Sequence, residues 1–137
     1  MTTRILAVED DPTMQMLYRC LCDKFGYHCT TVDSCKEALA VLEQIKFDLI
    51  IMDIRLVGIN GLKCTVAIRE TEARLNIHTP IVAVTAQAMP IDRELCLAAG
   101  MVDYLSKPFT IQQFHNLVEH STNKVLPFRE KRKANGG

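Results

Sequence analysis

Acidic side chains follow two short apolar runs of this chain, at positions where they could bind a metal ion together. Glu9 and Asp10 come directly after the run Ile5–Val8, and Asp53 comes directly after the run Leu49–Met52. Carboxylates that lie close together raise one another's pKa unless a cation lies among them. Carboxylate oxygens suit a hard divalent ion, and Mg²⁺ typically binds through one or two carboxylates together with phosphate and water. The three residues therefore predict a Mg²⁺ site.

A hydroxyl and an ammonium group follow two later strand-like segments. Thr85 follows the apolar run 81–84, and Lys107 lies shortly after the segment 102–105. Together with the carboxylates, these groups suit phosphoryl transfer to Asp53, because Mg²⁺ and Lys107 would offset the negative charge of an acyl phosphate. Thr85 would donate a hydrogen bond to a phosphoryl oxygen. A carboxylate is a recognised nucleophile in the formation of an aspartyl phosphate.

These five side chains converge only if the strands that carry them are parallel. Short, continuously apolar runs are typical of strands that are buried on both faces of a parallel sheet. Such runs alternate with helix-like segments along this chain, which indicates βαβ units with right-handed crossovers. The sequence therefore predicts an α/β fold: a doubly wound, flavodoxin-like, five-stranded parallel sheet of order 2-1-3-4-5, with five helices on both faces. In this order the carboxyl ends of strands one and three border the crevice where open α/β sheets bind ligands.

The predicted elements follow from capping and turn signals. Pro12 suits the first turn of a helix, and Asp11 before it is expected to cap that helix rather than bind the metal. Strands are predicted over residues 4–9, 28–32, 48–53, 81–84 and 102–105. Helices are predicted over residues 12–25 and 38–45, from after Gly61 to residue 72, and over residues 91–99 and 110–120.

Composition excludes several other classes of protein. The chain has 137 residues, of which 48% are hydrophobic and 23% charged, as expected for one globular domain. Its formal net charge is zero, so no long-range field attracts nucleic acid or an anionic membrane. No segment approaches the roughly 20 apolar residues of a membrane span, and the N-terminus lacks a signal-peptide pattern. We therefore expect a cytoplasmic protein that binds neither nucleic acid nor a membrane.

The regular pattern ends near residue 122, which predicts one domain over 1–122. The remaining residues, 123–137, include a mostly basic stretch at 129–133 and are expected to form a charged, solvated tail or linker. The chain contains six cysteines but no Cys-x-x-Cys pair. We expect all six to be buried or half-buried thiols in a reducing compartment.

Four segments, taken in order, resemble the receiver domain of two-component response regulators. They are residues 5–11 (ILAVEDD), 48–61 (DLIIMDIRLVGING), 80–86 (PIVAVTA) and 98–109 (AAGMVDYLSKPF). The resemblance covers roughly residues 4 to 120, and the last segment is most similar to receivers attached to hybrid histidine kinases. It implies that a sensor histidine kinase or a histidine phosphotransfer protein donates a phosphoryl group to Asp53.

The resemblance also implies a role for each remaining residue of the site. Asp10 would bind Mg²⁺ directly and Glu9 through water, and the backbone carbonyl of Arg55 would be a further ligand. Thr85 and Tyr104 would form the conformational switch, with the hydroxyl moving toward the phosphoryl group and the ring turning inward. A downstream effector would then bind the surface made by the fourth helix, the fifth strand and the fifth helix. Lys107 corresponds to the family's lysine, and Pro108 follows it where family members often have a cis peptide bond.

Two alternatives remain open at this point. One is a phosphatase with an aspartyl nucleophile, although such enzymes usually carry a second aspartate where this chain has Arg55. The other is a degenerate receiver that binds partners without being phosphorylated, although all the reacting groups are present here. The chain departs from the family pattern at Val57, where most members have proline. We expect a signalling phosphoacceptor rather than an enzyme that acts on a separate substrate.

Overall fold

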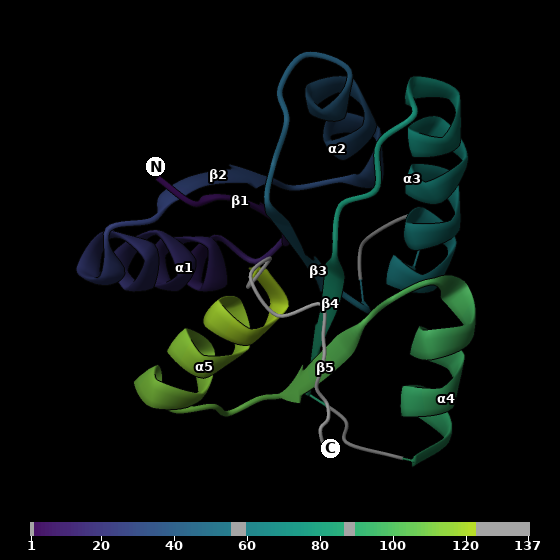
Figure 1. The fold of residues 1–137 in the computed structure, drawn as a ribbon. Coiled ribbons are helices and arrows are strands. Elements are labelled where there is room, and N and C mark those ends of the chain that lie inside the picture. Colours follow the sequence, from purple (N-terminus) through teal and green to yellow (C-terminus); the bar gives the residue numbers. More distant parts are fainter. Residues whose placement is uncertain (1, 56–59, 87–89, 123–137) are drawn as a thin grey trace, which may run out of the picture.

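Strands and helices alternate along the whole described part of the chain, which in this computed structural model comprises residues 2–55, 60–86 and 90–122 (Figure 1). The strands are β1 (Arg4–Val8), β2 (His28–Val32), β3 (Leu49–Asp53), β4 (Ile81–Thr85) and β5 (Asp103–Ser106). The helices are α1 (Pro12–Phe25), α2 (Cys35–Leu42), α3 (Gly61–Leu75), α4 (Pro90–Ala99) and α5 (Ile111–Thr122). Val57 and the expected tail at 123–137 lie outside the described residues.

The predicted sheet is confirmed. All strands pair in parallel, in the order β2-β1-β3-β4-β5. Val8 at the end of β1 is in register with Met52 in β3, so the residues that follow each of them emerge at the same edge. Asp53 is in register with Val84 of β4, one residue before Thr85. The register therefore brings the ends of β1, β3 and β4 together.

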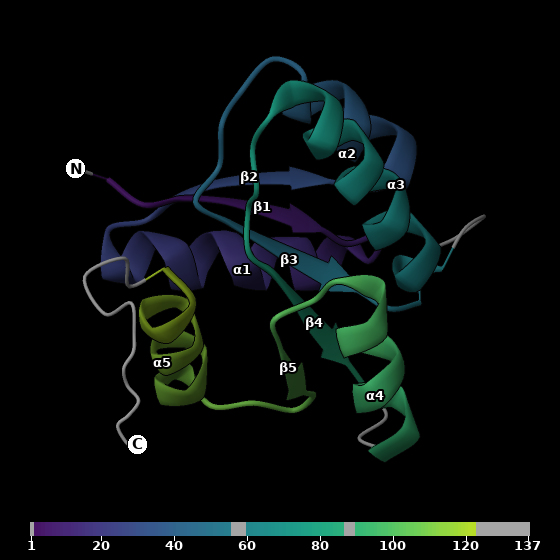
Figure 2. The same ribbon diagram turned by 45° about the vertical axis from the view of Figure 1, so that its right-hand side comes forward.

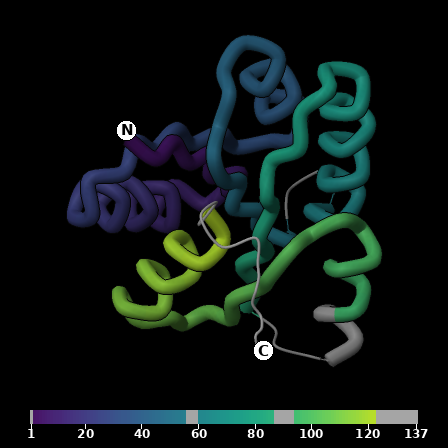
Figure 3. The backbone as a smooth tube through the Cα atoms, viewed as in Figure 1, coloured from purple at the N-terminus to yellow at the C-terminus, as the bar shows by residue number. Residues whose placement is uncertain are grey.

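Helices cover both faces of the sheet, as Figures 1 and 2 show from two directions. Helices α1 and α5 lie on one side, and α2, α3 and α4 lie on the other. Successive strand residues point to opposite faces, so each strand supplies two hydrophobic cores. In β1, for example, Ile5 and Ala7 pack toward α1 and α5, whereas Leu6 and Val8 pack toward the other three helices. The tube in Figure 3 shows how the chain crosses from one strand to the next through these helices.

Caps fix where three helices begin or end, and they correct two predicted bounds. The helix expected from residue 38 begins at Cys35, because the side chain of Ser34 accepts a hydrogen bond from the Glu37 amide (3.2 Å) and so caps the first turn. The helix expected to end near residue 72 continues to Leu75. Asn76 ends it in the left-handed conformation, with a φ of 58°. The expected cap at Asp11 is present, with its carboxylate accepting a hydrogen bond from Thr13 (3.0 Å).

The expectation of six free thiols is wrong. Cys35 and Cys64 form a disulfide, with their Cα atoms 5.7 Å apart, and Cys20 is exposed. Cys35 lies in the first turn of α2, which the sequence did not predict to be helical. There it faces Cys64 in α3, and the distance between their Cα atoms is one that a disulfide spans. Within the described ranges, no helix is long and apolar enough to cross a lipid bilayer.

Candidate functional site

The three acidic residues predicted from the sequence do converge. Oxygen atoms of Glu9, Asp10 and Asp53 all lie within 4.8 Å of one another at the carboxyl ends of β1 and β3. Glu9 and Asp53 are buried and Asp10 is half-buried, so the cluster faces a partly solvated crevice. Carboxylates this close repel one another, and an oxygen-binding divalent cation among them would remove that repulsion.

Asp53 is held by the backbone that follows it. Its Oδ1 atom accepts a hydrogen bond from the backbone amide of Arg55 (3.1 Å). Gly61, at the start of α3, packs directly on this turn and donates a hydrogen bond from its amide to the Ile54 carbonyl (2.7 Å). A Cβ atom at Gly61 would overlap the carbonyl oxygen of Asp53 and the Cα of Ile54. The helix predicted from the sequence begins only after Gly61, and this contact was not predicted because it depends on how α3 approaches β3.

Glu9 is the most buried member of the cluster, with 1% of its surface exposed. Its Oε2 atom accepts a hydrogen bond from the Asp11 amide (3.1 Å), and Nζ of Lys107 lies 3.5 Å from its Oε1 atom. Burial raises the pKa of Glu9 to about 7, and the charge of Asp53 and a hydrogen bond with it act in the same direction. The Asp11 amide and the Lys107 ammonium oppose this shift. Glu9 therefore exchanges a proton near neutral pH, unlike an ordinary glutamate.

Gln15 supports Glu9 from α1 and was not identified from the sequence. Its Nε2 atom donates a hydrogen bond to the backbone carbonyl of Glu9 (2.6 Å). This contact fixes the carboxyl end of β1 against the first turns of α1. A glutamine near the start of a helix gives no sequence signal for such a role, because many exposed helix positions carry one.

Thr85 and Lys107 lie at the ends of neighbouring strands, as predicted. Thr85 ends β4 and is buried, and its backbone carbonyl accepts a hydrogen bond from the Lys107 amide (2.7 Å). The peptide bond between Lys107 and Pro108 is cis, as the family resemblance implied. The structure thus brings the predicted ammonium group to the acidic cluster and the predicted hydroxyl to the adjoining strand end.

An aromatic stack on the α1 and α5 side supports the segment that carries Lys107. The ring of Phe109 stacks on Tyr18 of α1, with centroids 6.5 Å apart, and lies 6.2 Å from the ring of Phe114 in α5. Tyr18 and Phe114 are both buried. These contacts anchor the turn after β5 and were not predicted from the sequence.

Tyr104 lies away from the acidic cluster, in the second position of β5. It is half-buried and packs against the core beneath α2, α3 and α4. Its register partner is Ala83, two residues before Thr85 in β4. Thr85 and Tyr104 are therefore on adjacent strands, as a coupled pair requires, although Tyr104 takes no part in the cluster itself.

Comparison with known proteins shows which family of domains the chain resembles. Residues 5–119 match the family model of the response regulator receiver domain. The chain is 37% identical over 124 residues to the sensor protein GacS of Pseudomonas syringae pv. syringae, covering 90% of this chain and 14% of that protein. It is 36% identical over 114 residues to the polar-differentiation response regulator DivK of Brucella ovis, covering 83% of this chain and 91% of DivK. The chain thus spans about one seventh of GacS but nearly all of DivK.

A solved structure shows the same fold with a metal. The receiver domain of the sensor histidine kinase PA1611 from Pseudomonas aeruginosa PAO1 superposes with a TM-score of 0.80, at 36% sequence identity. The match covers 90% of this chain and 99% of that domain. The PA1611 structure contains a magnesium ion coordinated in its active site cleft. These matches confirm the resemblance to receivers attached to histidine kinases.

Proposed function

This chain belongs to the receiver domain family of two-component signal transduction, and on that premise we propose that Asp53 is its phosphoacceptor. The phosphoryl group comes from a phosphohistidine of a sensor histidine kinase or a histidine phosphotransfer protein. The chain assists its own phosphorylation and slow dephosphorylation, and it does not act as an enzyme on a separate substrate. The transfer is Mg²⁺-dependent and changes the conformation through Thr85 and Tyr104.

One observation supports this proposal most strongly. The carboxylates of Glu9, Asp10 and Asp53 lie within 4.8 Å of one another, and the ammonium group of Lys107 borders them at Glu9. A purely structural cluster of three acids so close together would be unfavourable. The arrangement is suitable when a divalent cation and a phosphoryl group enter the crevice.

The donor set fits Mg²⁺. The oxygen ligands would be the carboxylates of Asp10 and Asp53 and the backbone carbonyl of Arg55, with Glu9 acting through water. Nitrogen and sulfur ligands, which softer metals prefer, are absent from the described acidic cluster. Bound Mg²⁺ would offset the negative charge of the carboxylates and of the entering phosphoryl group.

The protein's own groups position the reaction. An oxygen of Asp53 attacks phosphorus, the bond between phosphorus and the histidine nitrogen breaks, and its electron pair returns to the imidazole. The Arg55 amide, which donates to Oδ1, holds the Asp53 carboxylate in place. Lys107 and Thr85 then bind phosphoryl oxygens, one through its charge and the other through its hydroxyl.

The same contacts suggest how phosphorylation of Asp53 changes a surface outside the site. Movement of Thr85 toward the phosphoryl group changes the packing beneath Tyr104 on the neighbouring strand, so the effector surface is that of α4, β5 and α5. Leu95, Leu97 and Ile111 already expose apolar surface in these helices. A ligand shifts a two-state equilibrium only by its different affinity for the two states, and the phosphoryl group supplies that difference through Thr85 and Lys107.

Acetyl phosphate, with and without Mg²⁺, tests the proposal by intact-mass spectrometry. A single phosphoryl adduct that requires Mg²⁺ and is absent from Asp53→Asn is the expected result. Rapid hydrolysis of acetyl phosphate without an adduct would favour the phosphatase instead. Neither adduct nor turnover, with acetyl phosphate or with a phosphorylated histidine phosphotransfer domain, would identify a degenerate receiver.

A further inference from the structure

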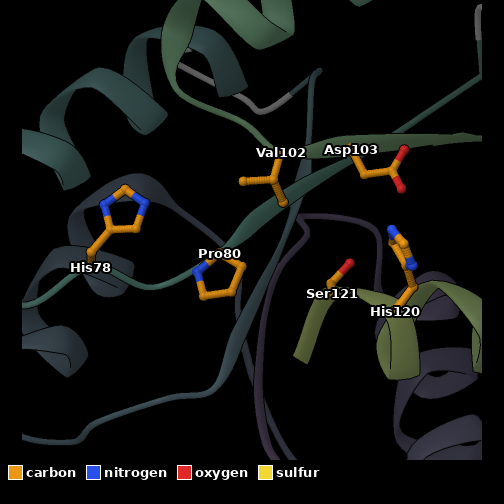
Figure 4. A pocket seen from close by; sticks show the side chains of 6 residues that line it. All are labelled: His78, Pro80, Val102, Asp103, His120 and Ser121. Carbon is orange, nitrogen blue, oxygen red and sulfur yellow. The ribbon is translucent and has the colours of Figure 1, made fainter. Parts of the chain in front are cut away.

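A cavity of about 260 Å³ opens at the amino ends of β4 and β5, at the opposite edge of the sheet from Asp53. Three segments form its walls: the loop before β4, the start of β5 and the last turn of α5. Figure 4 shows its lining residues, which are His78, Pro80, Val102, Asp103, His120 and Ser121. The cavity therefore lies directly beside the point where α5 ends.

The walls suit an apolar segment that carries a flat ring. Val102 exposes 47% of its surface, and Pro80 and the imidazoles of His78 and His120 present flat rings. The side chains of Asp103 and His120 point toward each other at one side, which leaves the rest of the cavity less polar (Figure 4). At about 260 Å³ the cavity is smaller than the roughly 300–1,000 Å³ of most small-molecule sites, so one or two side chains of a peptide fit it better.

A hydroxyl group in this cavity also lacks a partner. The Oγ atom of Ser121 is buried and makes no hydrogen bond to any described residue. A buried hydroxyl without a partner is unfavourable, and the backbone of an entering peptide would supply one.

We propose that the cavity binds the apolar run Val125–Phe128 of the chain's own C-terminal segment. This run, Val-Leu-Pro-Phe, begins only four residues after Ser121, and an extended chain covers about 14 Å in four residues. Lys124 precedes the run and Arg129 follows it, so a cation is available on either side for the carboxylate of Asp103. The run also contains a proline ring and a phenyl ring, which match the flat walls.

The short connection favours this occupant over a separate molecule. A peptide joined to its site by three residues has an effective concentration in the millimolar range, so even weak apolar contacts keep it bound. Because the cavity and Asp53 are at opposite edges of the sheet, the bound run leaves phosphorylation itself unaffected. A partner that binds along β5 and α5, however, would contact the bound run near Tyr104.

Timed trypsin digestion of the full chain, followed by mass spectrometry, tests the proposal. Cleavage after Lys124 and Arg129 reports on the run, and cleavage after Lys133 is the internal reference. Proteolysis follows the population of the open form when opening and closing are fast, so protection in the native chain measures binding. We expect Val102→Asn and Phe128→Ser each to increase cleavage at Lys124 and Arg129, relative to Lys133, by at least about fivefold. The double variant should show no further increase, because both changes remove one contact.

Two matched controls separate binding from general effects. Val66→Asn changes a valine of α3 outside the cavity that is 46% exposed, almost the same as Val102, and should leave cleavage unchanged. Asn135→Ala changes the segment outside the run and should also have no effect. All variants should accept a phosphoryl group from acetyl phosphate as the native chain does, which shows that each one folds. Amide shifts of Val102 and Ser121 in the native chain should move when Phe128 is replaced.

Three results would overturn the proposal. Equal cleavage rates in the native chain and in Phe128→Ser would show that the run is solvated. Protection that Phe128→Ser removes but Val102→Asn does not would place the run on another surface. Protection that increases with protein concentration would make the occupant a second copy of the chain.

Discussion

The ammonium nitrogen of Lys107 lies 3.5 Å from the Oε1 atom of Glu9, although 98 positions separate these residues in the sequence. Lys107 is partly exposed, whereas the Glu9 side chain is almost completely buried. The pair places a positive charge on one side of the acidic cluster. After the hydrogen bond from the Asp11 amide, the Lys107 ammonium group is the second influence that limits the rise in the pKa of Glu9, since it favours the ionised carboxylate.

The raised pKa of Glu9 predicts a pH dependence of stability without metal. Between the ordinary glutamate value of 4.5 and about 7, the folded protein keeps a proton on Glu9 that the unfolded chain has lost. The stabilisation is therefore complete below pH 4.5 and lost as pH rises through 7, by up to about 3 kcal/mol. Urea unfolding in EDTA should show this decrease, and Glu9→Gln should remove it. The same pH slope in both proteins would contradict the assignment.

Asp53→Asn should remove the acceptor and leave the fold intact. The amide is nearly the same size as the carboxylate and relieves repulsion with Glu9 and Asp10, so we expect an equal or higher thermal midpoint in the absence of Mg²⁺. Mass spectrometry with acetyl phosphate should detect no adduct at the site. Phosphoryl transfer at the native rate in this variant would exclude Asp53 as the acceptor.

Asp10→Asn should weaken Mg²⁺ binding by at least about tenfold, because it removes a charge and a direct ligand of the cation. Glu9→Gln, measured at pH 8, should weaken binding less, since Glu9 acts through water and charge. Titration followed by calorimetry or by amide shifts measures both constants. Unchanged affinity in Asp10→Asn would show that the metal binds elsewhere.

The Thr85→Ala variant should still accept a phosphoryl group, but phosphorylation should then cause little conformational change. One hydrogen bond contributes about 1 kcal/mol, so losing it should reduce the shift between the two states roughly fivefold. Hydrogen exchange of residues 94–104, before and after phosphorylation, reports this shift. Thr79→Ala is the matched control, because Thr79 is buried to a similar degree before β4. A full response in Thr85→Ala would remove the hydroxyl from the mechanism.

Gly61→Ala should displace the backbone of Asp53, on which Gly61 packs. The added methyl group overlaps the carbonyl of Asp53, so the free energy of unfolding should fall by about 1–3 kcal/mol and phosphorylation should slow. Gly26→Ala provides a contrast, since Gly26 has a φ of 76° but open space around it. That variant should lose about 1–2 kcal/mol through backbone strain alone and be phosphorylated normally. Equal phosphorylation rates in both variants would show that Gly61 does not position Asp53.

The sequence by itself determined which side chains reach the site. Short apolar runs predicted parallel strands, and a residue directly after such a run must emerge at the carboxyl edge of the sheet. Glu9, Asp53 and Thr85 could therefore be placed together before any coordinates were known. Capping signals were equally local, which is why Asp11 was correctly predicted as a helix cap.

Only the tertiary structure decided the contacts between elements that are distant in the chain. The hydrogen bond of Gln15 to Glu9, the packing of Gly61 on Asp53 and the disulfide between Cys35 and Cys64 all depend on how a helix lies against the sheet or against another helix. Hydrophobic periodicity specifies which face of a helix is buried but not its position along the sheet to within an ångström. For the same reason the sequence could predict that Glu9 lies in an acidic cluster, but only its burial and the approach of Lys107 set its pKa near neutrality.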